Sequence, residues 1–145
     1  MIVVIDDLFE DYSVVVKHLQ ETKKIEKAPE MVSTILNKAS QYFDLSSMKY
    51  YEAWTHALSR PADWHYDKDE RLYASKNELR FPLCSNVFYP IEDENLVGGN
   101  LIFENGVVVA PKRNRLVVFA PGLYHSVKPF RGKRISININ PWSTL

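Results

Sequence analysis

Two histidines and one aspartate stand at spacings that suit a metal site. His65 and Asp67 are two residues apart, so both side chains project from the same side of an extended chain. The second histidine, His125, follows a proline-glycine turn later in the chain. Two imidazoles and one carboxylate on one face of a metal suit iron(II) and leave three coordination positions open. The alternative interpretation is a polar surface turn at the first pair and an ordinary histidine at the third position.

A polar strand face near the end of the sequence is the second feature with chemical potential. From residue 134 onward polar residues alternate with isoleucine, and successive side chains of a strand point to opposite faces. One face therefore carries Arg134, Ser136, Asn138 and Asn140. Such a face is typical of a wet cavity inside a small barrel or sandwich. The planar guanidinium of Arg134 can pair with a carboxylate through two hydrogen bonds, and the hydroxyl of Ser136 can add a donor.

Other polar and aromatic residues are candidates for the lining of this cavity. The polar candidates, for which simple structural hydrogen bonding is the alternative, are Asn86, Tyr89 and Asn138. The aromatic candidates for substrate contact, which more often pack in a core or at its rim, are Trp54, Tyr66 and Trp142. We interpret three further residues as structural, namely His18, His56 and Cys84.

Helices are predicted only near the N-terminus. After a short strand at residues 2–5 we expect a helix at residues 8–20, with Asp6 or Asp7 as its N-cap. A second helix should begin at Pro29, because proline is favoured in the first turn. Both helices should pack along one outer face of a sheet.

After residue 47 the apolar period changes from 3.6 to two, which predicts strands. We expect strands at residues 48–56, 81–89, 98–103, 107–110, 115–120 and 134–142. Residues 58–64 are predicted to form a loop, and the charged residues 68–80 either a solvated loop or a mobile lid. This pattern predicts a mainly β fold, a jelly roll with N-terminal helices. We expect one domain over residues 1–145, with helical support at 1–47 and the jelly-roll core at 48–145.

Composition excludes several classes of protein. Eighteen basic residues balance eighteen acidic ones, which argues against nucleic-acid binding and against binding to an anionic membrane surface. Cys84 is the single cysteine, so no intrachain disulfide can form and a cytoplasmic location is expected. The N-terminal residues lack a basic segment and predict a strand rather than a signal peptide. The pattern leaves the oligomeric state open.

The motifs together resemble a known family, the 2-oxoglutarate and iron(II)-dependent dioxygenases, in the branch that includes the prolyl hydroxylases. The resemblance covers residues 48–142, and its motifs follow one another as His65-Tyr66-Asp67, Gly98 to Phe103, Pro111-Lys112, residues 115–119, His125 and Arg134-Ile135-Ser136. The triplet alone is a weak signal, but the ordered combination is specific. The chain departs from the family pattern six residues after Arg134, where an aromatic residue is frequent and this chain has Asn140.

The resemblance implies a fold, a metal site and a reaction. The fold is the double-stranded β-helix, the family's form of the jelly roll. His65, Asp67 and His125 would bind iron(II), and Arg134 would bind the far carboxylate of 2-oxoglutarate. The implied reaction uses O2 to convert 2-oxoglutarate to succinate and CO2 while a substrate is hydroxylated, with ascorbate as an optional reductant.

The substrate of such an enzyme would be a peptide, with a prolyl side chain among the candidates, or a small molecule. Asp67 favours hydroxylation over halogenation, because halogenating relatives vacate that position for chloride. The alternative function is a catalytically silent binding module on the same jelly-roll scaffold.

Overall fold

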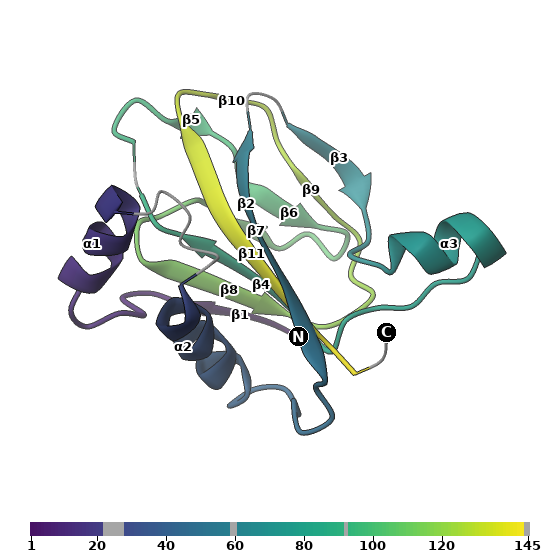
Figure 1. The fold of residues 1–145 in the computed structure, drawn as a ribbon. Helices are drawn as coiled ribbons and strands as arrows, with labels where there is room; N and C mark the ends of the chain where they lie inside the picture. The colour runs from purple at the N-terminus through teal and green to yellow at the C-terminus, as the bar shows by residue number, and fades with distance from the viewer. Residues whose placement is uncertain (22–27, 59–60, 92, 144–145) are drawn as a thin grey trace.

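The computed structural model describes residues 1–21, 28–58, 61–91 and 93–143, and within these ranges the strands form three antiparallel sheets (Figure 1). The large sheet has the order β1-β8-β4-β11-β2, with bounds Ile2–Ile5, Arg115–Phe119, Ser85–Tyr89, Arg134–Trp142 and Tyr50–Leu58. The small sheet has the order β3-β9-β6-β7, with bounds Ala62–His65, His125–Val127, Leu101–Phe103 and Val108–Val109. A short ribbon pairs β10 with β5, with bounds Phe130–Arg131 and Val97–Gly98.

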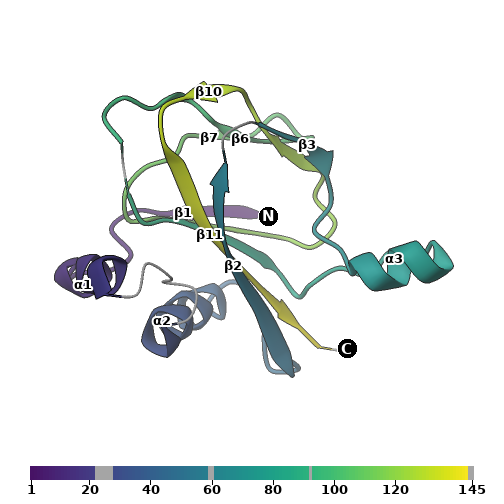
Figure 2. The same cartoon turned by 45° about the horizontal axis from the view of Figure 1, so that its top comes forward.

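Two helices cover the outer face of the large sheet, as predicted (Figures 1 and 2). They are α1, Ser13–Glu21, and α2, Pro29–Ala39, whose first turn contains the proline. Met31 and Ile35 of α2 are buried in one core with Ile137 and Ile139 of β11. The isoleucine face of β11 therefore lies under the helices, and its polar face is directed to the opposite side of the sheet.

A second core lies on that opposite side. It joins side chains of the large sheet to side chains of the small sheet, and its buried members are Val87, Tyr89, Leu101, Phe103, Val109, Val117, Phe119 and Val127. The mainly β architecture predicted from the sequence, with helices on one outer face, is confirmed. No helix in the described ranges is long and apolar enough to cross a membrane.

The first helix begins later than predicted. The backbone N–H of Leu8 donates to the carbonyl of Asn114, and the N–H of Phe9 donates to its side-chain Oδ1. These bonds hold the chain against the turn before β8. Asp7 has a left-handed φ of 54°, whereas an N-cap residue needs an extended backbone. The helix therefore begins at Ser13, and the prediction of a start at residue 8 is wrong.

Two predicted loops contain regular structure. Residues 58–64 include the start of β3, which pairs with β9 and brings His65 opposite His125. Residues 68–80 include the helix α3, Glu70–Lys76, which projects away from the sheets (Figure 2). Its N-cap is Asp69, whose side chain accepts a hydrogen bond from the N–H of Leu72. Because α3 buries none of its residues, it has no apolar stripe by which the sequence could have shown it.

Candidate functional site

The small sheet brings the three predicted metal ligands together. His65 ends β3 and lies directly opposite His125 at the start of β9. Asp67 lies two residues after His65 in the chain. Oδ1 of Asp67 is 3.3 Å from Nε2 of His125 and 3.6 Å from Nε2 of His65. One ligand atom from each residue lies within 4.8 Å of the others. The two histidines and the carboxylate thus converge on one point.

Hydrogen bonds fix which ring nitrogen of each histidine faces this point. Nδ1 of His65 lies 2.7 Å from the carbonyl oxygen of Asp63, and Nδ1 of His125 lies 2.8 Å from that of Leu123. A carbonyl oxygen can only accept, so each Nδ1 carries a proton, and Nε2 is the ring nitrogen that each histidine can offer to a metal. Metal-binding histidines usually have such a partner on the other nitrogen. The donor set therefore fits a divalent metal such as iron(II).

The carboxylate of Asp67 is held by groups from the large sheet. Nδ2 of Asn140 on β11 donates to Oδ2 of Asp67 over 3.2 Å. The hydroxyl of Ser85 on β4 also bonds to this carboxylate. Burial by itself would raise the pKa of Asp67, but His125, Ser85 and His65 together bring that pKa below its usual range. Asp67 is therefore present as a carboxylate, the form that binds a metal.

A cavity of about 70 Å³ lies between the two sheets, beside the three ligands. The predicted residues Trp54, Arg134, Ser136 and Asn138 line it together with the ligands. Arg134 is 3% exposed, and its Nε donates to the carbonyl of Gly99 over 2.9 Å. The described residues include no carboxylate in an ion pair with Arg134. A buried guanidinium without a counter-anion marks this part of the cavity as a site for an anionic ligand.

Other predicted lining residues have different positions. Tyr89 is buried beside Arg134, and its hydroxyl accepts a hydrogen bond from Nη2 over 3.2 Å. The prediction that Asn86 lines the cavity is wrong. Asn86 lies opposite Ile139 and Val118, and opposed residues of antiparallel strands share a face. Its side chain therefore points into the core under the helices, where Nδ2 donates to the carbonyl of Ile139.

Two of the predicted substrate contacts also do not line the cavity. The ring of Tyr66 packs against those of Tyr124, 4.7 Å away, and Phe81, 5.7 Å away. Trp142 is 3% exposed, stacks on Tyr50 and donates from Nε1 to the carboxylate of Glu52. Both rings are occupied by packing, which was the alternative interpretation. Trp54, at 37% exposure, is the predicted aromatic residue that a substrate at the cavity could reach.

Three residues of the site were missed by the sequence interpretation. His56, interpreted as structural, lines the cavity from β2. Burial lowers the pKa of His56, and the charges of Arg134 and His65 lower it further, which favours the neutral imidazole. Asn140 and Ser85 bond to Asp67. Alternation had placed Asn140 on the polar face, but its partner depends on how the two sheets meet.

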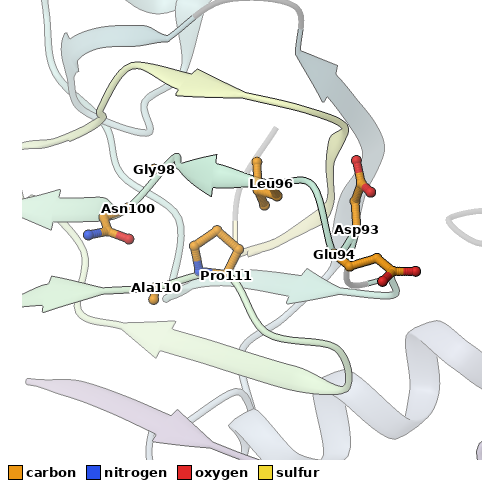
Figure 3. Close-up of a pocket in the computed structure, with 7 residues that line it drawn as sticks. All are labelled: Asp93, Glu94, Leu96, Gly98, Asn100, Ala110 and Pro111. Carbon is orange, nitrogen blue, oxygen red and sulfur yellow. The ribbon is translucent and has the colours of Figure 1, made fainter.

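A larger and more open groove of about 610 Å³ lies elsewhere, between residues 93–98 and the turn after β7 (Figure 3). The carboxylate of Asp93 on its rim accepts hydrogen bonds from the backbone N–H groups of Asn95 and Lys133. These bonds explain the acidic residue as a support for the loop. The described lining residues of this groove contain no histidine or cysteine, whereas the three candidate metal ligands lie at the smaller cavity.

In its fold the chain is similar to solved prolyl hydroxylases. One is the viral collagen prolyl hydroxylase of Paramecium bursaria Chlorella virus-1 in complex with 2-oxoglutarate, with a TM-score of 0.64 and 14% identity. That match covers 99% of this chain and 96% of the viral one. A second is the prolyl-4-hydroxylase of Pseudomonas putida, with a TM-score of 0.67 and 17% identity, covering 97% of this chain and 84% of that one. At these identities the similarity establishes the double-stranded β-helix fold.

The family follows from the sequence match. No curated protein matches the chain. Residues 52–142, well over half of the chain, match the family model described as the 2OG-Fe(II) oxygenase superfamily. The chain belongs to the 2OG-Fe(II) oxygenase superfamily, and iron(II) and 2-oxoglutarate are the metal and co-substrate that this membership and the histidine–aspartate set imply.

Proposed function

We propose that the protein hydroxylates a peptidyl or small-molecule substrate at a metal site formed by His65, Asp67 and His125. The observation that carries this proposal is the convergence of the Nε2 atoms of two histidines and one carboxylate oxygen beside a cavity that also contains a buried arginine. A binding module would have no need for this complete set. Bound iron(II) would supply the redox chemistry that activates O2 and decarboxylates 2-oxoglutarate.

The protein's own residues would bind and orient the reactants. Arg134 would pair with the far carboxylate of 2-oxoglutarate. Ser136, which lines the same cavity, and Tyr89, whose hydroxyl contacts Arg134, would each offer a hydroxyl to that carboxylate. The second core fills the space between the sheets on the side away from β2, so it would limit the access of water to the anion site from that side. Asn138, whose Nδ2 donates to the hydroxyl of Ser136, would hold that hydroxyl in place.

We infer that the substrate is a peptide, with a prolyl side chain as the leading candidate. The supporting observation is that the structurally similar proteins are described as prolyl hydroxylases. Trp54 at the cavity mouth offers an apolar ring on which a saturated side chain could pack. The lone buried Cys84 supports the related proposal of a reducing, cytoplasmic location.

The test is succinate release from 2-oxoglutarate, with iron(II), ascorbate and O2, measured against a panel of prolyl peptides, other peptides and free amino acids. We expect substrate-dependent release by the wild-type protein and none by His65→Ala or His125→Ala, which should also lose iron. Trp54→Ala should raise the KM for the substrate but leave iron and 2-oxoglutarate binding unchanged. Iron binding without succinate release for any substrate would favour the silent binding module instead.

A further inference from the structure

Asn140 connects the large sheet to the candidate metal site through one hydrogen bond. It is 3% exposed on β11, and its Nδ2 lies 3.2 Å from Oδ2 of Asp67. A carboxylate oxygen can only accept, so the amide must present its N–H₂ group to Asp67. The orientation of the amide is therefore fixed by this contact.

The two oxygens of Asp67 have different surroundings. Oδ1 faces the Nε2 atoms of His125 and His65, at 3.3 Å and 3.6 Å, whereas Oδ2 faces the amide of Asn140. A carboxylate can bind a cation through one oxygen or through both. Two-oxygen binding would use one of the three positions that a facial set of two histidines and one carboxylate leaves open.

The amide of Asn140 is poorly suited to a purely structural role. Its Oδ1 is buried and has no hydrogen-bond partner among the described residues. A buried acceptor without a donor destabilises a fold, and an apolar side chain of similar shape avoids that cost. The contact of Asn140 with Asp67 thus offers a reason for an asparagine at this position that packing does not.

We propose that Asn140 is a positioning residue that restricts Asp67 to metal binding through Oδ1 alone. This inference rests on the proposed function. The N–H donated to Oδ2 competes with its coordination and also holds the carboxylate plane in a fixed orientation. The open positions needed by 2-oxoglutarate and O2 are preserved as a result.

The experiment uses cobalt(II) as a redox-stable probe added to the metal-free protein. Asn140→Leu removes the donor at similar size. We expect its cobalt affinity to be about 10- to 100-fold lower than that of the wild type, the usual effect of losing a partner of a metal ligand. We also expect the visible absorption bands of bound cobalt to change, because the second oxygen of Asp67 loses the amide N–H that competes with the metal for it. Asn140→Ala, which cannot overpack the site, is measured in parallel and should show both changes.

The matched control is Asn86→Leu. Asn86 is also a buried asparagine, on the strand next to β11, and its Oδ1 likewise lacks a hydrogen-bond partner in the described part of the chain. Its Nδ2, however, donates to the carbonyl of Ile139. Its cobalt affinity and spectrum should equal those of the wild type. Cobalt binding that survives in His65→Ala would refute the proposed metal site itself. Binding that depends on His65 but is unchanged in affinity and spectrum in both Asn140 variants would overturn only the role of Asn140.

Discussion

Replacing Arg134 by lysine would keep a positive charge in the cavity but remove the planar fork of the guanidinium. Two of the five N–H groups of that fork are already used, by the carbonyl of Gly99 and the hydroxyl of Tyr89. The remaining donors can hold a carboxylate through two hydrogen bonds, whereas a lysine ammonium acts as a point charge. We therefore expect Arg134→Lys to weaken 2-oxoglutarate binding without abolishing it.

The magnitude follows from the hydrogen bonds lost at this buried position. One hydrogen bond to a charged group contributes about 1.5–3 kcal/mol. Because about 1.4 kcal/mol changes an equilibrium constant tenfold, Arg134→Lys should raise the Kd for 2-oxoglutarate about 10- to 100-fold. Arg134→Ala leaves the buried carboxylate without a cation, at a cost of about 3–5 kcal/mol. That corresponds to an increase in Kd of about 100- to 4,000-fold.

The assay is an anaerobic titration of the iron-loaded protein with 2-oxoglutarate, followed by the metal-to-ligand charge-transfer absorbance. Iron affinity should be unchanged in both variants, because Arg134 is not a ligand. Arg131→Ala, an exposed arginine on β10, is the control and should bind 2-oxoglutarate like the wild type. Unchanged affinity in Arg134→Ala would refute the reasoning. Two other candidate cations, Arg115 and Lys112, already pair with Asp6.

Three further predictions concern the surroundings of the site. Gly99→Ala should weaken 2-oxoglutarate binding in the same titration, because its Cβ would lie 3.0 Å from Cδ of Arg134. The control is Gly106→Ala, which also places alanine at a positive φ but has no atom within 4 Å of the new Cβ, so it should only lower the melting temperature. Burial raises the pKa of Cys84 to about 11, so the thiol should resist a thiol reagent at pH 8 until the protein unfolds. Because this pKa is higher in the folded protein than in the unfolded chain, the contribution of the protonated thiol to stability should be lost as pH rises from about 9 to 11. Asp69→Ala removes the N-cap of α3, about 1 kcal/mol, and should speed amide hydrogen exchange in α3 but not in α2.

Local patterns predicted the elements whose signal lies within a short stretch of chain. The alternation of polar residues and isoleucine in β11 predicted both of its faces, and Arg134, Ser136 and Asn138 do line the cavity. Proline in the first turn predicted the start of α2. The spacing of His65 and Asp67 indicated a shared side, which the structure shows. In each case the pattern reflects burial or backbone geometry that neighbouring residues impose on one another.

Features that depend on contacts between distant segments could not be predicted in this way. Asn86 was assigned to the wrong face because its direction depends on the register of β4 against β11 and β8. The start of the first helix was wrong because Asn114, more than a hundred residues away, binds the backbone of Phe9. The strand β3 is too short to show an alternating apolar pattern, and it directly follows Pro61, which favours a loop. The helix α3 has no buried residue and therefore no apolar stripe. The contact of Asn140 with Asp67 could be seen only in the structure, because it depends on how the segment after β3 lies against β11.

The register of β11 determines the core and the candidate site together. Its pairing with β2 runs through the whole strand, and β4 pairs with it on the other side. A slip of one residue would turn Arg134 and Asn140 into the core under the helices and move isoleucine side chains into the cavity. A buried unpaired guanidinium and an empty apolar core would both be costly, so such a slip is opposed from both faces. The burial of Ile137 and Ile139 in one core with α2 therefore also holds Arg134 and Asn140 on the cavity side of the sheet, which links the position of the candidate site to the packing of the helices.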